Sequence, residues 1–95
     1  MNEMRGIEMD LQHYREQINM IDDELLRLFK ERMDVSRQIA LYKKAHGLPV
    51  LDAAREREKL AVIDEKAGED MRPYAHKLYE SLFELSRAYQ EDVII

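Results

Sequence analysis

The chain has 95 residues, 45% of them hydrophobic and 37% charged, with a formal net charge of −5 at pH 7. This length predicts one domain, residues 1–95, with a small hydrophobic core. The acidic balance argues against a nucleic acid or an anionic membrane surface as partner. The absence of cysteine excludes disulfide and thiolate chemistry. No apolar stretch has the length of a signal-peptide core or a membrane span, so we expect a cytoplasmic protein.

A first helix is predicted over about residues 7–45, because apolar residues recur there in steps of three and four. This apolar seam consists of Leu11, Tyr14, Ile18, Ile21, Leu25, Leu28, Val35, Ile39 and Tyr42. Gly47 and Pro49 predict its end. Such a helix is roughly 58 Å long, whereas a compact chain of this size has a radius of gyration of about 12 Å. We therefore expect the seam to be buried against a second copy, in an intertwined homodimer.

Two shorter helices are predicted after the first. Asp52 is a favourable N-cap for a helix over about residues 53–66, which ends near Gly68. Pro73 suits the first turn of a third helix, over about residues 73–91. The seam of that third helix is Leu78, Leu82, Leu85 and Tyr89. No stretch alternates with the period of a strand, so the predicted fold class is all-α with three helices.

Arg32 occupies a seam position where the pattern calls for an apolar residue. Either its stem packs in the seam while its guanidinium reaches water, or it is an interior cation that binds an anion. Lys43 follows on nearly the same face, about three turns later. Arg15 borders the seam at its other end, too far from Lys43 for the two to share a ligand within one chain. Although both are also typical surface charges, two antiparallel chains would bring Arg15 of one close to Arg32 and Lys43 of the other, and this predicts two shared anion sites.

Polar residues of the second and third helices complete this candidate site. Asp52, Arg55 and Glu56 share one face of the second helix at its first turn, and Ser86 and Gln90 lie one turn apart on the third. Taken alone, each group is equally typical of a helix cap, of ion pairs within a helix or of an ordinary solvated face. The histidines show no metal-ligand spacing, and there is no glycine-rich phosphate loop, so we expect neither a metal nor a cofactor.

Several short stretches occur in a characteristic order and spacing. They are Tyr14-Arg15-Glu16-Gln17-Ile18, Ile21-Asp22, Leu28 to Arg32, Lys43, Pro49-Val50-Leu51-Asp52, Arg55-Glu56-Arg57, and Ser86 with Gln90. Each stretch alone is weak, but together they resemble the all-helical class of chorismate mutase, from about Leu11 to Gln90. The connection between the second and third helices is short for that family.

The resemblance implies the Claisen rearrangement of chorismate to prephenate, the branch step of the shikimate pathway toward phenylalanine and tyrosine. The reaction needs no cofactor, metal or covalent intermediate. By resemblance, Arg15 of the partner subunit and Arg32 bind the two substrate carboxylates. Lys43 and Gln90 then donate hydrogen bonds to the ether oxygen of the breaking bond.

The remaining candidate residues are also assigned by resemblance. Glu56, with the backbone near Asp52, receives the substrate hydroxyl, and Arg55 and Ser86 complete the carboxylate side. Two alternatives stay open: an isochorismate–pyruvate lyase on the same fold, and a non-catalytic helical dimerisation or regulatory domain. The apolar C-terminal residues are also compatible with fusion to, or association with, another aromatic-pathway enzyme. Because an amide donates at any pH, we expect activity over a broad pH range that includes neutral pH.

Overall fold

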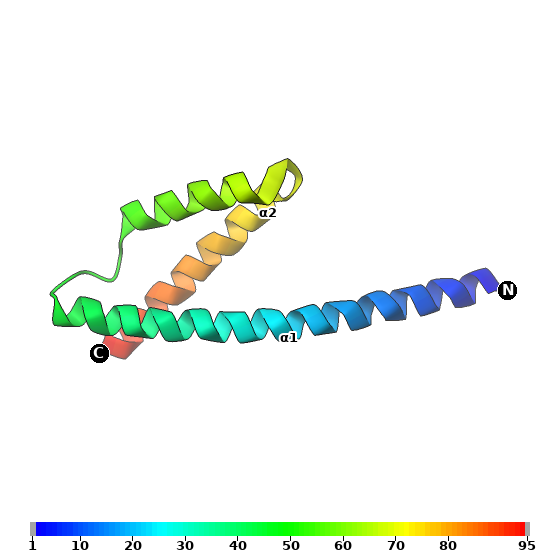
Figure 1. Cartoon of the computed structure of the whole chain (residues 1–95), viewed down its shortest axis with the longest axis horizontal. Helices are drawn as coiled ribbons and strands as arrows, with labels where there is room; N and C mark the ends of the chain where they lie inside the picture. The colour runs from blue at the N-terminus through cyan, green and yellow to red at the C-terminus, as the bar shows by residue number, and fades with distance from the viewer. Residues whose placement is uncertain (1, 95) are drawn as a thin grey trace. The chain divides into compact units, whose positions relative to one another are not determined.

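The computed structural model describes the backbone of residues 2–94 and the side chains of residues 10–94. Within these residues it contains two helices, α1 (Asn2–Ala45) and α2 (Ala53–Ile94), and no strand (Figure 1). The predicted all-α class is confirmed. The prediction of three helices was wrong, because the second and third predicted helices form the single element α2.

A kink at Gly68 explains this difference. Gly68 has φ 78° and ψ 165°, so it is non-helical inside α2, and a positive φ is a conformation that glycine adopts without a steric penalty. The chain therefore changes direction at one residue instead of over the predicted turn of several residues. We call residues 53–67 the first arm of α2 and residues 69–94 the second arm; Figure 1 shows the second arm folded back from the first. Pro73, predicted to open the third helix, lies inside the second arm.

Side chains on both sides of the kink are linked through Asp64. Arg72 Nε donates to the backbone carbonyl of Asp64 at 2.9 Å, which satisfies one of the carbonyls that lack an intrahelical partner near a helix end. His76 Nδ1 lies 2.9 Å from Asp64 Oδ1, and His76 Nε2 lies 3.9 Å from the Glu80 carboxylate. The pKa of His76 is raised, chiefly by the hydrogen bond to the Asp64 side chain.

The C-terminus of α1 has a specific cap. Gly47 has φ 66°, the Leu48 amide donates to the Lys43 carbonyl at 2.8 Å, and the Gly47 amide donates to the Lys44 carbonyl at 3.4 Å. This is the Schellman arrangement, with glycine at the left-handed position. α1 thus ends at Ala45, the last residue of the predicted helix, whereas it begins at Asn2, earlier than predicted. Gly6 lies inside it, and one helical glycine costs only about 1 kcal/mol.

The chain divides into two compact units, Met1–Arg32 and Met33–Ile95. In the first unit the predicted seam is 45–60% exposed, at Leu11, Tyr14, Ile18, Ile21, Leu25 and Leu28. Among the side chains that the structure describes, the buried apolar residues are Ala40 and Phe83 alone. One chain by itself therefore withdraws little apolar surface from water. None of the helices, as far as they are described, combines the length and apolarity needed to cross a membrane.

Candidate functional site

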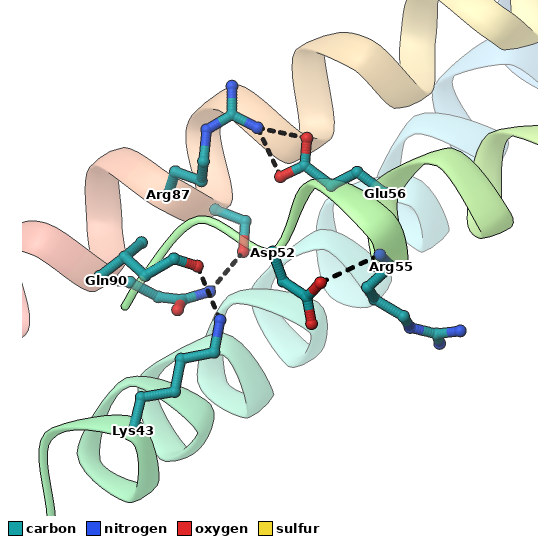
Figure 2. Close-up of polar contacts among 8 residues, drawn as sticks. Lys43, Asp52, Arg55, Glu56, Arg87 and Gln90 are labelled. Carbon is teal, nitrogen blue, oxygen red and sulfur yellow. Dashed lines mark hydrogen bonds and ion pairs between the residues drawn. The ribbon is translucent and has the colours of Figure 1, made fainter. Parts of the chain in front are cut away.

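Three polar contacts connect three segments of the second unit. Ser36 of α1 contacts Ser86 of the second arm through their hydroxyl oxygens, at 2.7 Å. Lys43 of α1 donates to the backbone carbonyl of Val50, just before α2, at 2.7 Å. Glu56 of the first arm pairs with Arg87 of the second. Each of the three segments is linked to the other two by one of these contacts, so residues 36–43, 50–56 and 86–90 lie close together (Figure 2).

Lys43 is held at both its backbone and its side chain. Its carbonyl accepts the Leu48 amide in the helix cap, and its half-buried ammonium group donates to Val50. An ammonium group has three hydrogens, so this one bond leaves donors for a ligand. Lys43 lies on α1 and reaches toward the connection that precedes α2, as Figure 2 shows.

Gln90 belongs to a buried polar chain. Its Nε2 donates to Ser86 Oγ at 3.1 Å, and Ser86 in turn contacts Ser36. All three side chains are less than a tenth exposed. Gln90 Oε1 is buried without a hydrogen-bond partner, although most buried polar atoms in proteins have one. One of the two amide hydrogens of Gln90 is used by Ser86, so the second is available to a ligand.

Asp52 caps α2 and places the residues that follow it. Its Oδ1 accepts the Arg55 backbone amide at 3.1 Å, and its carbonyl accepts the Glu56 amide at 3.1 Å. This is the N-cap geometry that the sequence predicts, with the side chain bonded to the third helical residue. The Arg55 side chain itself is exposed and points away from Asp52 in Figure 2. Arg55 contributes its backbone here, not its guanidinium group.

Glu56 is the acceptor of the cluster. Arg87 Nη1 lies 2.5 Å from each of its two carboxylate oxygens, and the side chains are 25% and 29% exposed. The contact joins the two arms of α2 on the side away from the kink. A half-buried carboxylate with a bound guanidinium is a site of low net charge that can still accept hydrogen bonds.

The two remaining predicted cations belong to the first unit. Arg15 is exposed, and Arg32 is half-buried. Both lie on α1, in the unit Met1–Arg32. The polar contacts described above are confined to the second unit and do not test the predicted roles of these two arginines.

Sequence reasoning missed two contributors to the cluster, Ser36 and Arg87. Ser36 gave a signal, since it lies four positions after Arg32, and positions four apart share a helix face. Arg87 gave none, because its partner Glu56 is 31 residues away on the other arm. No periodicity within a helix connects two such positions.

Chemically, the cluster offers hydrogen-bond donors and one charge-balanced acceptor. The donors are an ammonium group and an amide, from Lys43 and Gln90, and the acceptor is Glu56. Among the described side chains, no group of three or more His, Cys, Asp or Glu residues has a geometry that could hold a metal ion. The arrangement is suited to binding and polarising a small polar molecule through fixed donors.

These features define an all-α protein with an internal polar cluster at the junction of α1 and α2. A comparison with protein families gives a match to chorismate mutase type II over residues 14–91. The chain therefore belongs to the chorismate mutase type II family, and the resemblance seen in the sequence is confirmed. Comparisons with curated proteins and with solved structures give no significant match.

Proposed function

We propose that the protein catalyses the rearrangement of chorismate to prephenate, in the synthesis of phenylalanine and tyrosine. The observation that carries the proposal is the meeting of Lys43, Glu56 and Gln90 in one cluster of a chain of this family. The donor character of two of these residues and the acceptor character of the third match the ether oxygen and the hydroxyl group of chorismate.

In this proposal the protein acts by positioning and by electrostatics. The flexible enolpyruvyl side chain must be held in the reactive chair-like conformer, which lowers the entropic part of the barrier. Negative charge grows on the ether oxygen as the carbon–oxygen bond breaks, and preformed donors stabilise that charge. Lys43 and Gln90 are assigned this role. Gln90 Nε2 uses one hydrogen for Ser86 and has a second amide hydrogen to donate to the ether oxygen.

The other candidate residues complete the proposed site. Glu56, supported by the backbone at Asp52, accepts the substrate hydroxyl, and Ser86 and Arg55 assist on the carboxylate side. For Arg55 this requires the exposed side chain to change its rotamer. Arg32 and Arg15 of the partner subunit bind the two carboxylates, because a dianion in an acidic protein needs a local concentration of cations.

The active form is proposed to be a homodimer with sites shared between chains. The exposed seam of the first unit and the two-residue buried apolar set among the described side chains support this. Each half-exposed Leu or Ile that a second chain covers contributes roughly 1 kcal/mol. Five such side chains in the seam of each chain, together with Tyr14, make a monomer the less stable form. A solution mass equal to one chain would contradict the proposal.

The direct test is conversion of chorismate to prephenate by the purified chain. Isochorismate is assayed in parallel, with salicylate and pyruvate as the products to detect. Prephenate formation supports the proposal. Salicylate and pyruvate formation instead would assign the lyase reaction, and absence of both would leave a non-catalytic member of the family.

The variant Arg32→Ala tests the assignment of the site. We expect activity to fall by orders of magnitude while the dimer stays folded, because the change removes a cation that binds a substrate carboxylate and leaves the apolar seam in place. The matched control is Arg27→Ala, on the same helix. Arg27 is exposed and pairs with Glu24 and Glu31 on the surface, where such pairs contribute little. Near-normal turnover by Arg32→Ala would show that the site is wrongly assigned.

A further inference from the structure

Arg87 lies outside the set of residues that the sequence indicates, yet it makes a half-buried ion pair within the cluster. One of its nitrogens bonds both oxygens of Glu56 (Figure 2). A nitrogen held between both oxygens fixes where the carboxylate group lies, and each oxygen keeps a lone pair for a further donor. Arg87 also lies three residues before Gln90 on the second arm, so one short helical segment carries both groups.

Without Arg87, the negative charge of the Glu56 carboxylate would repel the proposed ligand. Chorismate carries two negative charges, and like charges a few ångströms apart repel strongly near a partly buried site. Arg87 puts an equal and opposite charge directly on Glu56. Each carboxylate oxygen has two acceptor positions, so the pair keeps free acceptor capacity while its net charge is zero.

We propose that Arg87 is a positioning residue, which orients Glu56 and cancels its charge so that Glu56 accepts the hydroxyl group of a dianionic substrate. This inference rests on the proposed function. It assigns the hydroxyl-bearing part of the ligand to the junction of the two arms of α2. Arg87 acts through Glu56 and makes no contact with the ligand itself.

A purely structural role is the competing explanation, since the pair also ties the two arms together. The two explanations differ in their response to charge. If Arg87 acts by charge cancellation, removing both charges restores binding of the dianion, and salt weakens the effect of removing Arg87 alone. If Arg87 is only a mechanical tie, removing its partner as well restores nothing, and salt has no specific effect.

The experiment compares Arg87→Met, Arg87→Lys, Glu56→Gln and the double variant Arg87→Met with Glu56→Gln. Arg37→Met is the matched control, because Arg37 is an exposed arginine of α1 in the same unit. kcat and KM for chorismate are measured at low and high ionic strength. Thermal melting by circular dichroism reports folding, and Arg87→Gln replaces Arg87→Met if the latter does not fold.

We expect Arg87→Met to raise KM about tenfold, equivalent to about 1.4 kcal/mol, with a smaller effect on kcat. The ratio of its KM to that of the natural chain shrinks at high salt. Arg87→Lys restores most of the binding, and the double variant has a lower KM than Arg87→Met. Arg37→Met leaves KM unchanged.

Two results would overturn the proposal while chorismate is still converted. One is a KM for Arg87→Met equal to that of the natural chain; the other is a raised KM that neither salt nor the second substitution reduces. If the natural chain does not convert chorismate, the proposed function fails, and calorimetric binding of chorismate by the same variants then decides on Arg87. The proposal for Arg87 is also overturned if the natural chain does not bind chorismate, or if Arg87→Met binds chorismate as tightly as the natural chain.

Discussion

The substitution Gln90→Glu tests whether position 90 must donate a hydrogen bond. Gln90 is 6% exposed, and among the described residues its side chain forms one hydrogen bond, 3.1 Å from Nε2 to Ser86. A glutamate here has nearly the same shape but donates only when it is protonated. Burial raises the pKa of such a carboxyl group, because the charged form loses its hydration and gains only the Ser86 hydroxyl. The positive charge of Lys43 lowers the pKa of the same group. We therefore predict that the activity of Gln90→Glu rises toward low pH, and we do not assign the pH of half-maximal activity.

The magnitude follows from the loss of one donor to a developing oxyanion, which typically costs 10²–10³-fold in kcat, or about 3–4 kcal/mol. At pH 7.5 we expect Gln90→Glu to lose activity by this factor. Below the pKa of the new carboxyl group the donor returns, so log kcat/KM falls by about one per pH unit above it. The natural chain has an amide and should show a flat profile from pH 5 to 8.

The assay is loss of chorismate with formation of prephenate across that pH range. Gln90→Met is the matched control, since it fills the same volume without a donor and should be weak at every pH. Circular dichroism at each pH verifies that both variants are folded. Full activity of Gln90→Glu at pH 7.5, or equal activities of Gln90→Glu and Gln90→Met at pH 5, would refute the donor role. A sharp loss of activity by the natural chain between pH 5 and 7 would do so too.

Two further predictions concern the dimer and the kink. Dimers of Arg15→Ala and dimers of Lys43→Ala, each inactive alone, should regain activity when mixed and allowed to exchange subunits, because the heterodimer has one intact site; no recovery speaks against shared sites. The pKa of His76 is raised, chiefly by the hydrogen bond to Asp64, so protonated His76 stabilises the fold. This stabilisation should be complete below the ordinary histidine pKa of about 6.5. It should be lost as pH rises through the higher pKa of the folded state. Melting temperatures at several pH values should therefore favour the natural chain over His76→Gln only on the acid side, and a difference independent of pH would contradict this.

Local signals predicted several features of the fold because they act over a few residues. Gly47 at a left-handed position ends α1, and Asp52 caps α2 through the Arg55 amide. Both depend on hydrogen bonds between neighbours in the sequence, so the residue types alone indicate them. The same signals failed at Gly68, because a turn of several residues and a kink at one glycine start from the same glycine-containing sequence.

The candidate site was less accessible to such reasoning. Spacing within a helix places Ser86 and Gln90 on one face, but it says nothing about Ser36, which meets them from α1. Arg87 and Glu56 meet only because the kink folds one arm of α2 back. A contact of this kind depends on the angle between two helical arms, which is set by packing and not by periodicity. Family resemblance supplied Glu56 as a candidate, but without the partner that holds it.

The contacts of the cluster also bear on how the proposed reaction would be catalysed without acid or base groups. Lys43, Glu56 and Gln90 are each held by a hydrogen bond within the protein itself. Their orientation is therefore established during folding and need not be established at the moment of reaction, which is the condition under which fixed donors accelerate a step most. The buried Gln90 Oε1 is the exception, and an unsatisfied group of this kind costs about 1–3 kcal/mol. This cost falls on an acceptor atom, whereas the proposed role of Gln90 depends on the donor Nε2, which the bond to Ser86 holds in place.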